Sequence, residues 1–480
     1  MRLIRTNVYQ FKTLFDTSRP LALSTLMVQY HFFGDSVLPY HVFNVSVHLI
    51  NAILVYALLI QLLRKKSTAV TNNQRLVAFA AAAIFATHPL QTQAVTYIVQ
   101  RMTSLAALFF LGAVNLFLHQ YFSNRGRGRF RQLLISIGIL LMGLSAFLSK
   151  ENAIVLPMIL GLATLLYFPT RLKQRNVSNP VIAIMLLAVI FLAFIINRKT
   201  LTNYTPTLLL TPRGEYLTPY SYWLTQLAVL PKYLGQLIIP IRQNIDHGVP
   251  VTTEFGAQPA KGAFVIVGML MLMGLMMRKR PMITFGIGWF LITMLVESSV
   301  FPINDVYVEH RLYLPLVGLL IAVAQPLYEL LQSGKNAKKS AIFCLILLIF
   351  GLSYMTFRRN IIWQDDRVLW TDAAIKAPQN PRAQYNEALA DLNAHDVPKA
   401  IDAFFRAIDA NPKFHRAYNN LGALMFQQGE YQLSAKYFMM ALSFNTEEEL
   451  YDKNLNRAIQ YLDSTDTLSP PPEMAEAMFH

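Results

Sequence analysis

Several residue types that often reveal a function are scarce in this sequence. Cys344 is the single cysteine, so the chain cannot form a disulfide framework, and its cysteine content does not indicate a redox compartment. The ten histidines lie without the spacing of a metal site, and we find neither a glycine-rich phosphate loop nor the residues of a nucleophile triad. The first 20 residues are polar and basic, unlike a cleavable signal peptide. The sequence therefore predicts no metal site and no nucleophilic enzyme of these kinds.

Charged residues are scarce too, and long apolar runs take their place. Hydrophobic residues make up 54% of the chain and charged residues only 14%, which is too apolar for a soluble protein of 480 residues. Apolar windows of about 17 residues or more indicate membrane spans, and we predict about ten of them, which makes the fold an all-α polytopic helix bundle. The predicted spans are residues 41–63, 76–88 (a short one), 103–122, 132–149, 152–168, 181–197, 261–277, 282–299, 312–332 and 340–357.

The net charge of +15 is the one electrostatic excess, and its distribution indicates a membrane topology. Five loops between the predicted spans carry clustered Lys and Arg without acidic residues. They are every second loop along the chain, so all five lie on the same side of the membrane. Such loops face the cytoplasm and its anionic leaflet, so the charge predicts topology rather than a nucleic-acid partner. The clustered residues are Arg64, Lys65, Lys66 and Arg75; Arg125, Arg127, Arg129 and Arg131; Arg171, Lys173 and Arg175; Arg278, Lys279 and Arg280; and Lys335, Lys338 and Lys339.

This orientation places the remaining loops and both termini outside the cytoplasm. We interpret the apolar segment 220–240 as a re-entrant or interfacial helix on the outer side, because a span there would move Arg278–Arg280 outside. An outer N-terminus without a signal sequence suggests that a first span is missing from the chain as given. The segments expected outside are residues 1–40, 88–102, 149–152, 198–260, 300–311 and the chain after 358.

A helical repeat of 34 residues follows the last predicted span. When Pro381–Pro412 is aligned with His415–Thr446, small and aromatic residues coincide: Ala388 with Gly422, Ala400 with Ser434, Phe404 with Phe438 and Ala407 with Ala441. Small residues allow two helices to approach, and the phenylalanine fills the space between stacked hairpins, as in the tetratricopeptide (TPR) pattern. We predict a TPR domain at 359–462 that ends in a capping helix at 450–462, and a flexible tail at 463–480.

Most polar residues of the membrane region fall in the segments expected outside. An ionisable group near a helix end in a bilayer is costly unless it lines a cavity or pairs. Each residue alone is consistent with an interfacial anchor or a pair with a neighbouring helix, but as a set they indicate an active site at the membrane–water interface. They are Arg19-Pro20, Tyr40-His41, Asn44, His48, His88-Pro89, Gln93, Arg101, Lys150-Glu151, Asp246-His247, Glu309-His310-Arg311 and Tyr313.

Six segments, in chain order, carry a family resemblance, and five of them contain residues of this set. They are Ser18–Leu21 with Tyr40–Asn44 and His48; His88–Val95 continuing to Arg101; Leu148–Glu151; Ile239-Pro240 with Asp246; Glu309–Pro315; and Arg359-Asn360 with Trp363, Asp366 and Leu369-Trp370. The series resembles that of the TMTC-type proteins, which are TPR-containing protein O-mannosyltransferases of the GT-C class, and of their bacterial relatives. Single motifs of this kind are weak, but six in order followed by the repeat are specific.

The resemblance implies a GT-C-like membrane domain at 41–358 that transfers a sugar from a polyprenyl-phosphate donor to an extracytoplasmic hydroxyl group, on protein Ser or Thr. The chemistry needs a carboxylate that takes the acceptor proton, cations for the leaving lipid phosphate, and an apolar groove for the prenyl tail. Glu151 and Glu309 are the catalytic candidates, as bases or as partners that hold the cations. The donor-binding candidates are Arg19, Arg101, Lys150, Arg311 and Tyr313.

Three departures from the family pattern leave a second hypothesis open. GT-C enzymes of this type carry an acidic pair in the first outer loop, here predicted at 1–40, and the chain lacks it. Gln93 stands where the family often has Glu, and His310 separates Glu309 from Arg311. Either the chain is truncated at a downstream Met or it has lost the usual base, and in the latter case it is a non-catalytic, membrane-anchored TPR scaffold. A transporter is less consistent, since we find no inverted repeat.

The expected partners are membrane lipid and a protein acceptor or partner bound by the TPR domain. Short loops favour a bacterial inner membrane, with the TPR domain in the periplasm.

Overall fold

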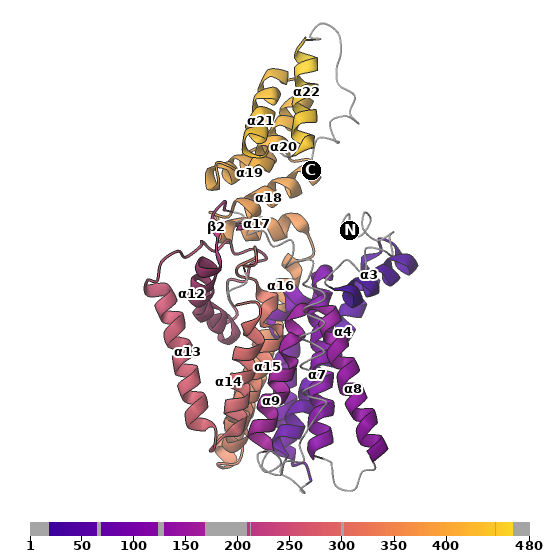
Figure 1. Ribbon diagram of the computed structural model, residues 1–480, viewed down its shortest axis with the longest axis vertical. Helices are drawn as coiled ribbons and strands as arrows, with labels where there is room; N and C mark the ends of the chain where they lie inside the picture. The colour runs from indigo at the N-terminus through magenta and orange to yellow at the C-terminus, as the bar shows by residue number, and fades with distance from the viewer. Residues whose placement is uncertain are drawn as a thin grey trace.

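The computed structural model of the protein describes residues 19–64, 69–122, 129–168, 209–211, 213–298, 302–446 and 448–463. Within these ranges the chain is helical almost throughout, and two short strands, β1 (Leu209–Leu210) and β2 (Tyr216–Leu217), pair antiparallel. Figure 1 shows a bundle of long helices beneath a smaller group of C-terminal helices, which confirms the predicted all-α fold. The predictions that lie outside the described residues are the span 181–197, nearly all of the tail 463–480, and the cations at 65–66, 125, 127 and 171–175.

Six helices among the described residues are long and apolar enough to cross a membrane, so the protein is an integral membrane protein. They are Val37–Leu63 (α4), Ile98–Phe122 (η2, Ile98–Gln100, and α7, Arg101–Phe122), Phe130–Ser149 (within α8, Arg129–Ser149), Ala257–Met276 (α13), Glu309–Leu330 (η4, Glu309–Leu312, and α15, Tyr313–Leu330) and Lys335–Ile362 (α16). Three shorter helical segments stand at the predicted spans 76–88, 152–168 and 282–299. They are α5 (Asn72–Thr87), Glu151–Tyr167 (η3, Glu151–Val155, and α9, Leu156–Tyr167) and α14 (Pro281–Leu295).

Glycines allow a close helix crossing inside the bundle, between α14 and α15. A Cβ atom on Gly286 would lie 2.4 Å from the carbonyl oxygen of Gly318, and one on Gly318 would lie 2.6 Å from that of Gly286. Small residues at such crossings let membrane helices pack backbone to backbone. Beside the crossing, Trp289 is fully buried against Phe110, and its indole N–H donates to the carbonyl oxygen of Leu314 at 2.9 Å. This core fixes the outer ends of α14 and α15 against each other.

One end of the bundle gathers basic residues. Arg280, which precedes α14, pairs with Glu329 near the end of α15 at 2.7 Å. Lys338 at the start of α16 donates to Asn73 at the start of α5 at 2.8 Å, and Asn73 donates to the carbonyl oxygen of Leu331. The described residues of three predicted basic loops therefore meet at one end of the bundle, as the charge pattern requires.

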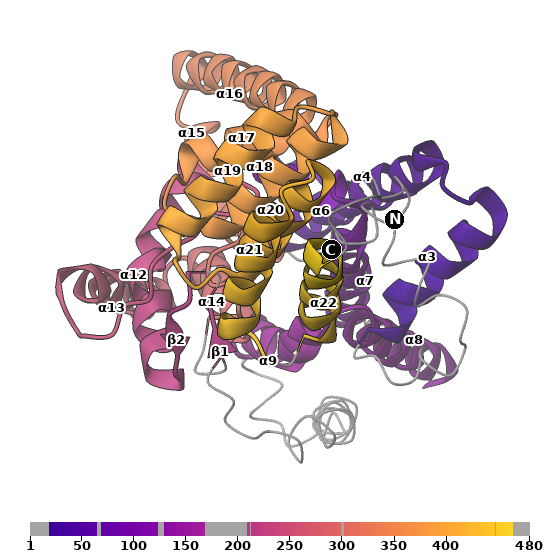
Figure 2. The same cartoon turned by 90° about the horizontal axis from the view of Figure 1, so that it is seen from above.

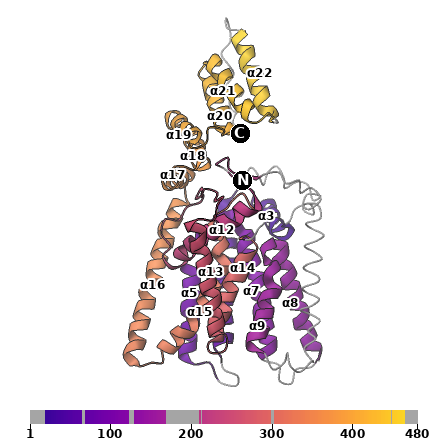
Figure 3. The ribbon, with the colours of Figure 1, turned by 60° about the vertical axis from the view of Figure 1, so that its left-hand side comes forward.

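The opposite end carries short helices that are inclined to the bundle (Figures 1 and 2). In Figure 2, α3 and α13 lie at opposite edges of the molecule. The segment 220–240 forms α12, which is buried over much of its length and lies at this end, beneath the C-terminal helices (Figure 3). Part of the predicted loop 1–40 is also helical, because Pro20 starts α3. The short helices of this end are α3 (Pro20–Phe33), η1 (Pro89–Gln91), α6 (Thr92–Val95), η2, η3, α12 (Pro219–Ile238) and η4.

The C-terminal helices form pairs at the predicted spacing. The helices are α17 (Asp366–Lys376), α18 (Pro381–Asn393), α19 (Val397–Ala410), α20 (His415–Gln427), α21 (Tyr431–Phe444) and α22 (Glu449–Asp463). Both α20 and α21 begin 34 residues after their counterparts α18 and α19. The aligned small and aromatic residues, from Ala388 to Ala441, are all buried. We call α17–α22 the repeat region; Figure 3 shows it rising from the end of the bundle that carries α12.

The bundle ends allow a test of orientation. We expect Asn336, at the basic end, to face the cytoplasm and Lys453, in α22, to face the outside. Asn336→Cys and Lys453→Cys, each in a Cys344→Ser background, are labelled with a membrane-impermeant maleimide in intact cells. Labelling at 453 and not at 336 is expected, and the reverse pattern would show that the positive-inside orientation is wrong.

Gly422 provides a test of the repeat packing. A Cβ atom there would lie 2.7 Å from a ring carbon of Phe438, which is fully buried, so Gly422→Ala overpacks α20 against α21. We expect a loss of about 1–3 kcal/mol in the opening free energy of these helices, measured by native-state hydrogen exchange on the full chain. Lys436→Ala, on the exposed side of α21, is the matched control and should change this energy by less than about 0.5 kcal/mol.

Candidate functional site

Three charged side chains from distant parts of the chain meet at the end of the bundle opposite the basic residues, which we call the outer end after its predicted orientation. Lys150 follows α8, Glu297 lies in the turn after α14, and Arg311 lies in η4. Lys150 Nζ lies 2.6 Å from Glu297 Oε1, and Arg311 Nε lies 4.0 Å from Glu297 Oε2. All three side chains are buried, with exposed fractions of 4%, 11% and 3%. We call Lys150, Glu297 and Arg311 the ionic cluster.

Neighbouring elements hold the ionic cluster in place. Arg311 donates through Nη1 to the carbonyl oxygen of Val306 at 2.9 Å and through Nη2 to that of Asp305 at 2.6 Å. Lys150 donates to the hydroxyl of Thr103 in α7 at 3.2 Å. From α12, the Tyr222 hydroxyl donates to the carbonyl oxygen of Glu297 at 2.5 Å. The cluster therefore depends on the packing of α7, α8, α12 and the turns that follow α14.

The charges of the cluster are strongly coupled. Burial by itself raises the pKa of the Glu297 carboxyl, but the adjacent charges of Lys150 and Arg311 outweigh it and lower this pKa to about 2. Burial lowers the pKa of Lys150, and the Glu297 carboxylate opposes this shift. Glu297 is thus held as a carboxylate and is a poor proton acceptor, while two cations face the same small volume. An arrangement of this kind binds an anion or its own counter-ion.

A second ion pair lies at the rim of the site. Arg19, directly before α3, directs Nε to both carboxylate oxygens of Glu151 at 2.9 and 3.2 Å. The two side chains are 36% and 32% exposed, so water reaches this pair but not the cluster. Glu151 follows Lys150 in the chain, so the rim pair adjoins the cluster. Of the two predicted catalytic carboxylates, Glu151 is the accessible one.

Glu309 is instead buried and holds a neighbouring loop. Its Oε1 accepts from the backbone N–H of Asn244 at 2.7 Å and lies 3.1 Å from His247 Nε2. Glu309 is 2% exposed. It therefore fixes the loop between α12 and α13 next to η4, which differs from the predicted role of holding the cations.

The two internal departures from the family pattern contact each other. The backbone N–H of His310 donates to Oε1 of Gln93 at 2.8 Å, and the His310 ring nitrogen Nδ1 lies 3.2 Å from the same oxygen. Gln93 in turn donates to the carbonyl oxygen of Ile245 at 3.3 Å. A glutamine at position 93 thus links η4 with α6 and the 239–256 loop. The two departures from the family pattern therefore contact each other in this fold.

Two predicted donor-binding residues make close contacts with α4. Arg101 is fully buried, donates to Asn44 Oδ1 at 2.7 Å, and stacks on the Phe43 ring at 4.3 Å. Tyr313 shares a hydrogen bond of 2.7 Å with His48 Nδ1 and accepts from Asn51 at 3.0 Å inside the bundle. Both residues join α4 to its neighbours through these contacts. Among the predicted residues, the fold pairs Arg19 with Glu151 and brings Lys150 and Arg311 together at Glu297.

Glu297 is the site residue that sequence reasoning missed. It was counted inside the predicted span 282–299, whereas α14 ends at Leu295 and Glu297 lies in the turn beyond it. The available signal was an acidic residue near the end of an otherwise apolar segment, which by itself indicates a buried pair or a functional site. Among the described residues, no group of three His, Cys, Asp or Glu side chains is arranged to hold a metal ion.

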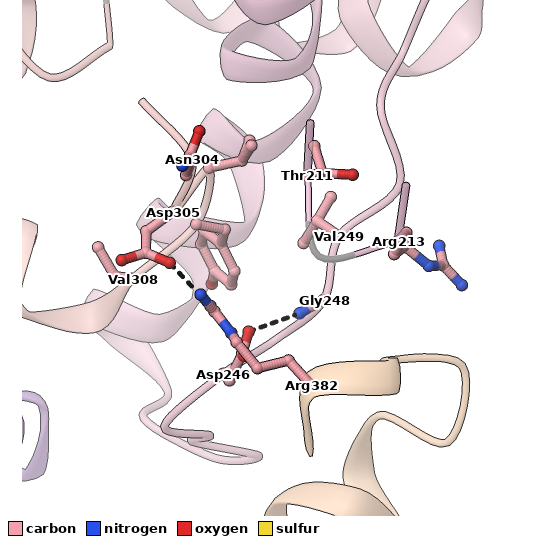
Figure 4. Close-up of a pocket in the computed structure, with 11 residues that line it drawn as sticks. Thr211, Arg213, Asp246, Gly248, Val249, Asn304, Asp305, Val308 and Arg382 are labelled. Atoms are coloured by element: carbon pink, nitrogen blue, oxygen red, sulfur yellow. Dashed lines mark hydrogen bonds and ion pairs between the residues drawn. The ribbon is translucent and has the colours of Figure 1, made fainter. Parts of the chain in front are cut away.

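A polar cavity lies beside the site, between the outer loops and the repeat region. It is open to solvent, and Figure 4 shows Arg382 crossing it toward Asp305. Arg382, from α18, pairs with both Asp305 and Asp246. The cavity is also lined by Thr211, Arg213, Gly248, Val249, Asn304, Val306, Tyr307 and Val308.

Comparison with known proteins supports the resemblance seen in the motifs. The chain is 27% identical over 412 residues to the Caenorhabditis elegans protein O-mannosyl-transferase F38B6.6. This alignment covers 83% of the present chain and 54% of the relative. It is 24% identical to human protein O-mannosyl-transferase TMTC3 (88% of this chain, 48% of the relative) and 24% identical to human TMTC1 (85% and 49%). The chain is therefore TMTC-like over most of its length, and it spans about half the length of these relatives. No protein-family model and no solved structure matches it.

The Lys150–Glu297 pair makes a prediction about stability. Removing one partner leaves the other charge buried and unpaired. Lys150→Met and Glu297→Gln should therefore each lower the free energy of unfolding by about 3–5 kcal/mol, and the double variant should lower it by less than the sum of the two. Thermal unfolding in detergent at neutral pH measures the cycle. Additive losses would show that the two side chains do not interact in the folded protein.

The Lys150–Glu297 pair also predicts how the stability of the protein depends on pH. Because the folded pKa of Glu297 is about 2 and the ordinary value is 4.5, its contribution to stability is complete above about pH 4.5 and is lost as the pH falls toward 2. The difference in melting temperature between the wild type and Glu297→Gln should therefore narrow through this range. A constant difference from pH 6 to pH 3 would contradict the lowered pKa.

Proposed function

We propose that this chain is a membrane glycosyltransferase that moves a sugar from a polyprenyl-phosphate donor to hydroxyl groups of protein acceptors on the outer side of the membrane. The observation that carries the proposal is the buried convergence of Lys150 and Arg311 on one carboxylate at the end of the bundle that also bears the repeat region. The likeness to protein O-mannosyl-transferases over most of the chain agrees with it. Since those relatives are named for mannosyl transfer, mannose is the sugar that we propose.

The two cations suit the leaving group of this reaction. When the acceptor oxygen forms a bond to the anomeric carbon, the bond from that carbon to the lipid phosphate breaks, and the phosphate leaves with the electron pair. Negative charge grows on its oxygens, and preorganised cations in a water-poor site stabilise that charge. We assign this role to Lys150 and Arg311, because both are buried and converge on Glu297, which keeps them charged and close together while no donor is bound.

The acceptor hydroxyl must lose a proton to a base. Glu151 is our candidate, because its carboxylate is one-third exposed at the rim and adjoins Lys150 in the chain. Its partner Arg19 orients the carboxylate through Nε. Glu309 is less suitable, since it is buried and its Oε1 already accepts a backbone hydrogen bond. In this mechanism Glu309 positions the loop beside η4.

The repeat region suits the capture of protein acceptors. Its helix pairs have the spacing and the packing positions of a TPR domain, which we propose it is, and such solenoids offer an extended surface for polypeptides. It stands at the same end of the bundle as the ionic cluster, so a bound acceptor lies on the side where the sugar is transferred (Figure 3). We propose the bacterial inner membrane as its location, with the repeat region in the periplasm.

The test is transfer of radiolabelled mannose from a polyprenyl-phosphate donor to Ser/Thr-containing acceptors by the purified full chain. Arg311→Ala and Lys150→Ala should each lower the rate by about 10²-fold, on the scale of one lost donor to a developing anion. Arg311→Lys should recover part of the rate, because it keeps the charge and loses the planar fork.

Arg280→Ala is the matched control for this test. It also removes an arginine that forms an ion pair, but Arg280 pairs with Glu329 at the opposite end of the bundle. Its rate should remain near that of the wild type. Equal rates for wild type, Arg311→Ala and Lys150→Ala would remove the ionic cluster from the mechanism. Absence of transfer in every form, together with retained capture of a polypeptide by the repeat region, would favour a membrane-anchored scaffold.

A further inference from the structure

Arg382, on the first complete pair of the repeat region, joins two outer loops of the membrane region. Its Nε donates to the carboxylate of Asp246, and its Nη2 lies 2.7 Å from Oδ1 of Asp305. Asp246 belongs to the loop between α12 and α13, whereas Asp305 belongs to the loop that precedes η4. A guanidinium can hold both carboxylates because its donors diverge in a rigid plane. Figure 4 shows Asp246 and Asp305 in the wall of the same cavity, with Arg382 between the two loops.

Each of these loops also contacts a residue of the candidate site. In the first loop, Asn244 donates its backbone N–H to Glu309 at 2.7 Å, and His247 lies 3.1 Å from the same carboxylate oxygen. In the second loop, the carbonyl oxygen of Asp305 accepts from Arg311 at 2.6 Å. The side chain of Asp305 is thus held by Arg382 while its carbonyl group holds the candidate phosphate-binding cation.

We propose that Arg382 is a positioning residue for sugar transfer, which sets Glu309 and Arg311 through these two loops and makes the site dependent on a docked repeat region. The proposal rests on the function proposed above. Arg382 touches neither donor nor acceptor in this scheme. It acts because a shift of the Asp305 carbonyl moves the Arg311 guanidinium, and small displacements of a charged group weaken its stabilisation of the leaving phosphate.

Other contacts at the junction each join the repeat region to a single loop. Lys376 donates to the carbonyl oxygen of Gln243 at 2.9 Å, and Asn380 donates to that of Asp246 at 3.3 Å. Gly248 fits closely, since a Cβ atom there would lie 2.5 Å from Cβ of Asn380. These contacts keep the repeat region docked on the 239–256 loop. Loss of Arg382 should therefore release the loop before η4 without detaching the repeat region.

A merely structural role for Arg382 makes a different prediction. If Arg382 only holds the repeat region over the membrane, its loss should raise KM for large protein acceptors and leave kcat unchanged for a short Ser/Thr peptide. If it positions the site, kcat should fall with both acceptors, because Arg311 is displaced in either case. The size of the acceptor thus separates positioning from capture.

The experiment combines two measurements on the full-length chain in detergent or nanodiscs. Hydrogen exchange of residues 239–252 and 302–308 reports the two loops independently of activity. Transfer kinetics with a mannosyl polyprenyl-phosphate donor report the site, with a six-residue Ser/Thr peptide and a folded protein as acceptors. Arg382→Ala should increase exchange at 302–308 and lower kcat by about 10- to 100-fold with both acceptors. Arg382→Lys should give an intermediate result, because it retains one ion pair.

Arg406→Ala is the matched control. Arg406 also bridges two carboxylates, those of Glu387 and Asp402, but all three residues lie in α18 and α19 and none belongs to an outer loop. It should leave exchange at 302–308 and the kcat for the peptide unchanged.

Unchanged exchange at 302–308 in Arg382→Ala overturns the proposal, and so does an increase in exchange with a normal kcat for the peptide. If the wild type transfers no sugar while its loops still respond to Arg382→Ala, the proposed function fails together with the positioning role of Arg382 in sugar transfer. In that case only the mechanical link between the repeat region and the loops is retained. Loss of transfer with the protein acceptor alone assigns Arg382 to acceptor capture and likewise overturns a positioning role.

Discussion

The need to pair buried charges at the outer end of the bundle is the constraint on which this structure depends. Burying Lys150 and Arg311 costs desolvation free energy, which their attraction to Glu297 between them offsets. The buried carboxylate of Glu297 in turn stays ionised because both cations are present. The three residues come from the ends of α8, α14 and η4. Their pairing therefore requires that these elements end at the same depth, which the glycine crossing of α14 and α15 and the burial of Trp289 enforce.

The same end of the bundle shows how a membrane region and a soluble helical region can share one site. Backbone groups of the outer loops hold Glu309 and Arg311, and side chains of α17 and α18 hold those loops in turn. The proposed acceptor-binding region is consequently continuous, through Arg382, with the proposed donor site. In this proposal, the placement of the acceptor-binding region affects the geometry of the donor site.

Much of this architecture was predictable, and the limits have identifiable causes. Apolar windows located the long helices, and small residues at a spacing of 34 located the helix pairs, because both signals depend on local periodicity. The motifs predicted Lys150, Glu151 and Arg311 as neighbours near the outer surface. Glu297 was missed because a window of hydropathy averages over one charge. The contact of His310 with Gln93 was invisible as well, since each residue alone looked like a departure from the pattern.

The helical class, the long apolar membrane spans, the basic end of the bundle and the repeat spacing can all be read from the chain, because they follow from which residues lie near one another in sequence. The pairing of charges became visible in the folded protein alone. The tertiary structure separated Arg101 and Tyr313, which bond within the bundle, from Lys150 and Arg311, which meet at Glu297. It also gave Arg382 two partners from different loops. Ion pairs between distant segments depend on where helices end and cross, and a single sequence carries no local signal for that.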